Sequence, residues 1–176
     1  MRKADMFQQS KPRIQLSDSE VYSMAQDCDA FKKTRKYLMA PVNKEEEDFP
    51  IAFSILMYKD TEMVERMLRA IYRPQNFYCI HVDAKAVENV RRAMSAIAEC
   101  FENVFISSRS IDVRWGEFSV LEPELVCMED LWRRSNKWKY FINLTGQEFP
   151  LKTNLQLVKI LKAYNGANDL ETTIKR

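Results

Sequence analysis

Four short apolar runs alternate with four amphipathic segments across residues 50–166. The runs are FPIAFSILMY, FYCIHVD, NVFISS and KYFINLTG, and each has the length of a strand. Apolar residues recur at helical spacing in the first three segments that follow, namely Met63, Met67, Leu68 and Ile71; Val87, Val90, Met94 and Ile97; and Leu121, Leu125, Met128 and Leu131. This alternation predicts a three-layer α/β fold around a mostly parallel sheet, whose strands are buried on both faces.

Cap and breaker residues set the expected limits of these helices. We expect Asp60 to cap the first helix and Pro74 to stop it. Pro123 falls inside the apolar pattern of the third helix, so it belongs in the first turn or at a kink. Gly166 marks the end of the fourth helix.

The sequence before the first apolar run is polar, with charges of both signs. We expect residues 1–16 to be disordered and residues 17–48 to form a partly helical lead-in, with one helix over 17–37. The run NKEEED at 43–48 is typical of a solvated linker. The folded domain is expected to occupy residues 49–176.

Composition excludes several classes of function. Hydrophobic residues make up 46% of the chain and charged residues 30%, as in a soluble globular protein. A net charge of +2, without basic blocks alternating with aromatic residues, argues against a nucleic-acid groove. No apolar run is long enough to span a bilayer. Residues 1–20 lack the apolar core of a signal peptide or anchor, so neither is expected within the chain.

Familiar cofactor and metal motifs are missing from the sequence. The chain has three glycines and neither a G-x-G-x-x-G nor a P-loop motif, which excludes dinucleotide and P-loop chemistry. His81 is the only histidine, so no multi-histidine metal site can form within the chain. Asp27-Cys28-Asp29 has the D-x-D pattern of a divalent ion site, but it lies on a predicted helix before the first strand. We therefore predict no metal site and no cofactor.

The four cysteines, Cys28, Cys79, Cys100 and Cys127, are widely spaced and form no C-x-x-C pair. That spacing argues against a zinc ribbon or a thioredoxin-type site. Their number alone leaves two alternatives open. They either form two disulfides in an oxidising compartment or remain four buried thiols.

Ligands of open α/β sheets bind beyond the carboxyl ends of the strands, and Asp83 stands at such an end. A carboxylate there can accept hydrogen bonds from ribose hydroxyls or from a base. It can equally cap the helix expected to begin near Lys85, and spacing alone favours the cap. His81, without partners of its own kind, is expected to be a buried strand residue.

Two further loops lie at the same edge of the predicted sheet. In RWGEFS, Trp115 can either stack on a ring or fill the core, while Gly116 permits an unusual backbone angle. In GQEFP, we expect Glu148 to lie in a solvated turn. Asn143-Leu144-Thr145 matches a glycosylation sequon, which we expect to be little used because it sits in a predicted buried strand.

Longer segments resemble one family. FPIAFSILMYKDTEMVERMLRAIYRPQNFYCIHVDAKA and WKYFINLTGQEFPLKTNLQLVKILK are similar to the core-2/I-branching β-1,6-N-acetylglucosaminyltransferases, which share a wider family with the peptide O-xylosyltransferases. CFENVF, CMEDLW and the terminal NDLET extend the resemblance over residues 26–172. VRWGEFS matches the xylosyltransferase-like version of its loop better, while the flanking segments favour the branching enzymes.

The resemblance implies a GT-A-like (Rossmann-like) fold and a type II Golgi membrane enzyme with a lumenal domain. Such enzymes transfer GlcNAc from UDP-GlcNAc to the 6-hydroxyl of galactose or GalNAc on O-glycans, with inversion and without a metal. Basic side chains then neutralise the departing diphosphate.

Carried over by position, the resemblance implies that Asp83 contacts the uridine part of the donor and that Met57 and Tyr58 line the nucleotide pocket. Trp115 stands where the core-2 enzymes have a tyrosine near the donor, so the identity differs there. The resemblance also implies two disulfides, Cys28–Cys100 and Cys79–Cys127.

The family's general base, a glutamate, lies in a C-terminal half that we do not find in this sequence, together with its acceptor-binding residues. We therefore expect the donor-binding half of a transferase, inactive by itself. The alternatives are a non-catalytic nucleotide-sugar-binding or interaction protein, and a xylosyltransferase-like member.

Overall fold

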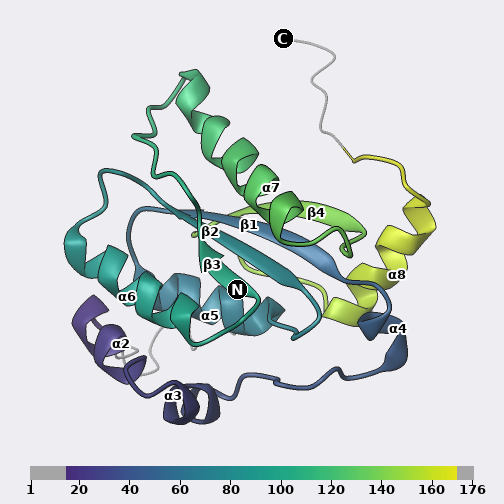
Figure 1. The fold of residues 1–176 in the computed structure, drawn as a ribbon, viewed down its shortest axis with the longest axis horizontal. Helices are drawn as coiled ribbons and strands as arrows, with labels where there is room; N and C mark the ends of the chain where they lie inside the picture. The colour runs from purple at the N-terminus through teal and green to yellow at the C-terminus, as the bar shows by residue number, and fades with distance from the viewer. Residues whose placement is uncertain (1–14, 170–176) are drawn as a thin grey trace, which may run out of the picture.

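The computed structural model describes residues 15–169, so most of the segment expected to be disordered lies outside the described residues. Its centre is a sheet of four parallel strands in the order β3-β2-β1-β4 (Figure 1). The strands are β1 (Ile51–Met57), β2 (Phe77–Val82), β3 (Val104–Ile106) and β4 (Tyr140–Thr145). The α/β fold class and the parallel sheet predicted from the alternating pattern are confirmed.

Helices cover both faces of the sheet (Figure 1). α5 (Thr61–Ile71), α6 (Glu88–Glu99) and α8 (Asn154–Tyr164) contribute to the larger core cluster, and α7 (Glu122–Arg134) contributes to a smaller one on the opposite face. A short 3-10 helix, η1 (Phe118–Val120), precedes α7. Within the described part of the chain, no helix is long and apolar enough to cross a bilayer.

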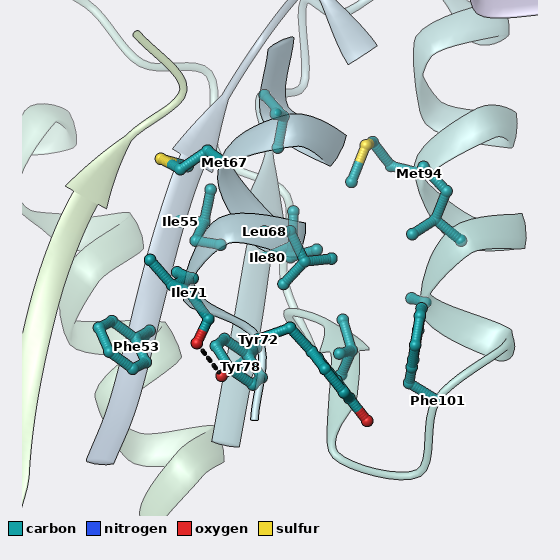
Figure 2. Packing of buried hydrophobic residues seen from close by; sticks show 14 of the residues in the cluster. Phe53, Ile55, Met67, Leu68, Ile71, Tyr72, Tyr78, Ile80, Met94 and Phe101 are labelled. Atoms are coloured by element: carbon teal, nitrogen blue, oxygen red, sulfur yellow. Dashed lines mark hydrogen bonds between the residues drawn. The ribbon is translucent and has the colours of Figure 1, made fainter. Parts of the chain in front are cut away.

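The larger cluster contains the side chains that point to one face of β1 and β2 (Figure 2). Phe53 and Tyr78 from these neighbouring strands stack with ring centroids 5.4 Å apart. The Tyr78 hydroxyl donates to the Ile71 carbonyl at 2.7 Å, which satisfies the polar end of a fully buried ring. Burial raises the pKa of this phenol well above its ordinary value.

Of the four residues predicted for the apolar face of α7, one, Leu131, is buried and the other three are exposed. Leu121, Leu125 and Met128 are 45%, 43% and 36% exposed, whereas Pro123, Val126, Cys127 and Leu131 are buried. Cys127 is joined to Cys79 of β2, and this bond fixes which side of the helix meets the sheet. Pro123 occupies the first turn, as expected. The predicted core residues Met63, in the first turn of α5, and Val87, at the N-cap of α6, are also exposed.

The segment 17–37 of the lead-in contains two helices where one was expected, α2 (Asp18–Met24) and α3 (Cys28–Arg35). Asp27 interrupts the helical run because its side chain accepts the Ala30 amide as the N-cap of α3. This contact gives the first aspartate of the D-x-D pattern a local structural role. Cys28 is bonded to Cys100 at the end of α6, so α3 is covalently attached to the core.

The segment 43–48 is not a solvated linker. It forms a short helix, α4 (Lys44–Glu47), and Glu46 is 2% exposed. One Glu46 oxygen accepts from Arg73 Nε at 3.2 Å and from Asn154 Nδ2 at 2.7 Å. These partners lie after α5 and at the start of α8, so the lead-in is fastened to the domain by a buried, charge-assisted network.

The N-cap position expected for Asp60 is confirmed, although its side chain does not cap the helix. Asp60 stands at the N-cap position of α5, but it has a left-handed backbone (φ 58°) and its side chain makes no capping hydrogen bond. At the other end, the helix stops at Ile71 and Tyr72 is extended, two residues before Pro74. That end agrees with the predicted stop, because proline disfavours helical backbone in the residue before it.

Replacing Glu46 with alanine should destabilise the fold by about 3 kcal/mol, because it leaves Arg73 and the Asn154 amide buried without their shared acceptor. The measurement is the free energy of unfolding in urea. Glu45→Ala is the matched control, since Glu45 pairs with Lys162 on the surface, and its cost should stay within about 0.5 kcal/mol. Equal losses for both variants would contradict the role of the buried network.

Candidate functional site

The strand order creates a crevice at one end of the sheet. The chain runs outward from β1 to β2 and β3, then returns to place β4 on the other side of β1. At such a switch point the connections leave on opposite faces, which opens a ligand site beyond the carboxyl ends of the strands. A cavity of about 270 Å³ lies there, lined by Leu56, Met57, Tyr58, Lys59, Asp60, Thr145, Gly146 and Gln147.

Gly146 allows the two sides of this crevice to meet. Its amide donates to the Leu56 carbonyl at 2.8 Å. A Cβ at this position would lie 3.0 Å from a methyl carbon of Val64 and 3.2 Å from Met57 Cβ. The turn beyond it is closed by Glu148, whose carboxylate accepts the Thr145 amide. Glu148 therefore has a local role in an exposed turn, as the sequence suggested.

Met57 and Tyr58, the residues that the resemblance assigns to the nucleotide pocket, both line this cavity. Met57 is 5% exposed and belongs to the core, whereas Tyr58 is half exposed at the end of β1. Lys59 lies over the Tyr58 ring, 5.1 Å from its centroid. The two residues thus give the crevice an apolar wall with a ring accessible to a ligand.

Asp83 lies beside the crevice at the end of β2. Its amide donates to the Met57 carbonyl at 2.8 Å, which joins the ends of β2 and β1. Its side chain is 9% exposed, and Oδ1 accepts the Lys85 amide at 2.7 Å. α6 begins only at Glu88, with Val87 at the N-cap, so the prediction that Asp83 caps this helix is wrong. The carboxylate closes a local turn at the carboxyl end of β2, and its two oxygens accept from the Lys85 amide and ammonium.

His81 is buried in β2, as predicted, and is 1% exposed. Its Nε2 accepts the Ile111 amide at 2.9 Å, so this nitrogen carries no proton and the ring is neutral. Burial lowers the pKa of His81, while the nearby Asp83 raises it to a smaller extent. The histidine therefore anchors a distant loop, which no local sequence signal indicated.

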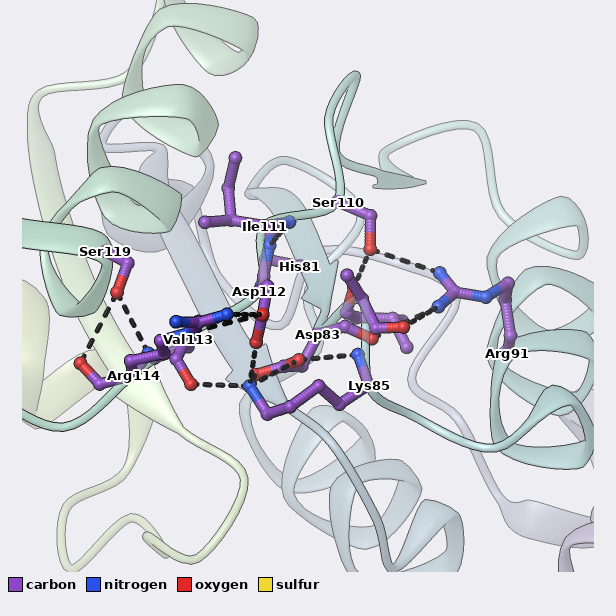
Figure 3. Close-up of polar contacts among 12 residues, drawn as sticks. His81, Asp83, Lys85, Arg91, Ser110, Ile111, Asp112, Val113, Arg114 and Ser119 are labelled. Carbon is purple, nitrogen blue, oxygen red and sulfur yellow. Dashed lines mark hydrogen bonds and ion pairs between the residues drawn. The ribbon is translucent and has the colours of Figure 1, made fainter.

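The segment 107–114 lies against the end of β2 (Figure 3). Ser110 Oγ donates to the Val82 carbonyl at 2.6 Å, and the Ala84 amide donates to the Ile111 carbonyl at 2.9 Å. Lys85 Nζ reaches both Asp83 and Asp112. Sequence reasoning identified Asp83 but missed Lys85 and Asp112, because they meet across 27 residues of chain.

Trp115 follows this segment and is 97% exposed, so the alternative that it fills the core is wrong. Gly116 has a φ of +80°, which confirms the unusual backbone angle expected there. Ser119 Oγ accepts the Arg114 amide at 2.9 Å and closes the loop before α7. The exposed indole is free to meet a ligand ring, and its donor contact stays a prediction.

Asn143 is exposed on the α7 side of β4, so the prediction that the sequon is buried is wrong. Its Nδ2 donates to Glu124 Oε2 of α7 at 3.2 Å. Burial raises the pKa of Glu124, and the bond from Asn143 opposes that shift. Use of the sequon stays untested.

The cysteines pair as the resemblance implies, Cys28 with Cys100 and Cys79 with Cys127. Among residues 15–169, no group of three or more histidine, cysteine, aspartate or glutamate side chains is placed to hold a metal ion.

Replacing Gly146 with alanine should cost about 1–3 kcal/mol of stability, because the added methyl group overpacks the contact with Val64 and Met57. Chemical denaturation measures the loss. Gln147→Ala, at the exposed neighbour on the same turn, serves as the control and should change stability by less than about 0.5 kcal/mol. A neutral Gly146→Ala variant would show that the turn moves apart without cost.

The bond between His81 and Ile111 predicts a loss of stability in acid. The pKa of His81 is lower in the folded chain than the ordinary value of 6.5, so the unfolded state binds more protons as the pH falls below about 6.5. Folding stability should therefore fall between pH 7.5 and pH 5.5. His81→Gln keeps an acceptor that does not titrate and should show a smaller fall in urea denaturation. Identical pH profiles would contradict this assignment.

Comparisons with known proteins identify the family of this chain. The family model for Core-2/I-Branching enzymes matches residues 51–176. The chain is 48% identical over 162 residues to a human beta-1,3-galactosyl-O-glycosyl-glycoprotein beta-1,6-N-acetylglucosaminyltransferase, covering 92% of this chain and 38% of the relative. It is 43% identical over 170 residues to the Bos taurus beta-1,3-galactosyl-O-glycosyl-glycoprotein beta-1,6-N-acetylglucosaminyltransferase 3. That match covers 97% of this chain and 39% of the relative.

A protein of bovine herpesvirus 4 that carries the same enzyme name is 42% identical over 170 residues, again covering 97% of this chain and 39% of the relative. The chain therefore spans about two fifths of the length of these relatives. Since the family model covers more than half of the chain, and the matched part holds the sheet and the crevice, the chain belongs to the Core-2/I-Branching enzyme family.

Proposed function

We propose that this chain forms the donor-binding part of a β-1,6-N-acetylglucosaminyltransferase and holds UDP-GlcNAc at the carboxyl ends of β1 and β2. The observation that carries the proposal is the position of Asp83. Its backbone is bonded to Met57, which lines the switch-point cavity, and its carboxylate is at the ligand edge of the sheet. Two further points support this site. The chain belongs to the Core-2/I-Branching enzyme family, and ligands of open α/β sheets bind beyond the carboxyl ends of the strands, where Asp83 lies.

The Asp83 carboxylate has capacity left for a ligand. Oδ1 accepts the Lys85 amide and Oδ2 accepts the Lys85 ammonium, whereas each carboxylate oxygen offers about two acceptor positions. The N–H of a uracil ring or the hydroxyls of a ribose are suitable donors. Tyr58, on the wall of the cavity, and Trp115, on the neighbouring loop, supply exposed aromatic surface for the nucleoside.

The proposed acceptor is an O-glycan on a glycoprotein, because the relatives are named as acting on beta-1,3-galactosyl-O-glycosyl-glycoprotein. Transfer with inversion requires a base that takes the proton of the attacking hydroxyl. We assign that base to the part of the relatives that this chain does not match. Glu148 is not a candidate, since its carboxylate holds the Thr145 amide. We further propose that transfer needs no metal and that basic side chains stabilise the diphosphate.

We place the protein in the Golgi lumen, by analogy with enzymes that modify O-glycans. Two disulfides support an oxidising compartment, because such bonds persist in the secretory pathway and are rare where thiols are kept reduced. The exposed Asn143 of the sequon is compatible with that environment.

Asp83→Asn should weaken binding of UDP by roughly tenfold or more, because it replaces a charged acceptor with a neutral amide. Binding to residues 1–176 is measured by NMR titration, where the unchanged chain is expected to bind weakly. Asp130→Asn is the matched control, since Asp130 accepts the Ser108 amide beyond β3 and does not line the cavity. Equal affinity for the unchanged chain and Asp83→Asn would overturn the assignment.

The same preparation should show no transfer of GlcNAc to an O-glycan acceptor, because the proposed base lies outside it. Turnover of UDP-GlcNAc to a branched product by residues 1–176 would contradict this division of roles.

A further inference from the structure

The loop next to the proposed donor site has little regular structure and is held mainly by polar contacts. Residues 107–114 contain no helix or strand and connect β3 to the region of η1. Ile111 is fixed through both its backbone groups, by His81 Nε2 and by the Ala84 amide. Arg91 adds a bond to Ser110 Oγ at 3.2 Å and one to the Asp83 carbonyl at 3.1 Å. These contacts join the loop to the end of β2.

Lys85 closes the remaining side of this loop (Figure 3). Its ammonium donates to Asp83 Oδ2 at 3.1 Å, to Asp112 Oδ1 at 2.7 Å and to the Val113 carbonyl. A lysine has three N–H donors, so all of them have partners within the protein. Arg114 provides a second cation for Asp112 at 3.1 Å. The ammonium is therefore engaged by the loop and by the site carboxylate at the same time.

Lys85 also determines how Asp83 is presented. Its amide holds one carboxylate oxygen and its ammonium holds the other. The carboxylate is nearly buried while the lysine is half exposed, so the lysine is the outer member of the pair. Without its side chain, one oxygen of Asp83 would lose its partner, and Asp112 and Val113 would lose their link to β2.

We infer that Lys85 is a positioning residue for the nucleoside end of the donor: it orients the Asp83 carboxylate and fixes the loop 107–114 as a wall of the site. It acts through these groups and does not bind the diphosphate. This role rests on the proposed function, because it assigns Asp83 to the nucleoside. The same contacts predict a property of the loop that requires no ligand, namely slow exchange of the Ile111 and Ala84 amides.

Two ligands separate positioning from diphosphate binding. Lys85→Met should lower the affinity for uridine and the affinity for UDP by the same factor, roughly tenfold. Both ligands carry the nucleoside that Asp83 is proposed to contact. Asp112→Asn removes the ion pair between Lys85 and the loop but leaves the bond of Lys85 to Asp83. It should therefore lower both affinities equally, and by less than Lys85→Met does. Lys139→Met, an equal change of charge at the opposite end of the sheet, is the control. NMR titrations of the full chain supply the affinities.

Hydrogen exchange tests the loop separately. The Ile111 and Ala84 amides should exchange roughly tenfold faster in Lys85→Met, and remain unchanged in Lys139→Met. If Lys85→Met lowers the affinity for UDP but not for uridine, Lys85 binds the diphosphate and the inference is overturned. Unchanged exchange of the Ile111 and Ala84 amides in Lys85→Met would also overturn it. If the unchanged chain binds neither ligand, the proposed function fails and the role toward the nucleoside fails with it. Faster exchange in Lys85→Met would still show that Lys85 holds the loop 107–114.

Discussion

The central position of β1 is the constraint on which the rest of this structure depends. The strand pairs in parallel with β2 on one side and with β4 on the other. Its register places Met57 opposite Val82 and Leu56 opposite Thr145, so the three strands end at the same level. Residues that follow those ends, Asp83 and Gly146, therefore flank the end of β1 on its two sides. The crevice follows from the strand pairing, and side chains only shape its walls.

The lead-in belongs to the same folded unit, because it is joined to the domain by buried polar groups as well as by a disulfide. Arg35 of α3 forms an ion pair with Glu65 of α5, and this partner raises the pKa of the guanidinium. Glu46 of α4 bonds to Arg73 beyond α5. Burying a charge is unfavourable unless it has a partner, so these pairs require the lead-in and the domain to be folded together.

The edge of the site is built differently from its floor. The floor consists of strand ends held by backbone hydrogen bonds and by the packing of Gly146 against Met57 and Val64. The edge is the loop 107–114, which is held by separate side-chain and backbone hydrogen bonds to the end of β2, the segment after it and α6. Such a loop is easier to change than a strand, because it lacks the continuous ladder of backbone hydrogen bonds that holds the sheet.

The sequence by itself determined the strands, the helices between them, the burial of His81 and the placing of Asp83 at the ligand edge, because these follow from local periodicity and from the ends of apolar runs. Tertiary structure alone decided three other features. α7 has apolar residues on two sides, and the buried side is the one that carries Cys127, which is bonded to Cys79 of β2. Glu46 lies in a sequence typical of a linker, but in the folded chain it is buried and accepts hydrogen bonds from Arg73 and Asn154. Lys85 gains its role from Asp112, 27 residues away. A pattern along the chain reports a residue's own surroundings, whereas the choice of a distant partner depends on how the whole chain folds.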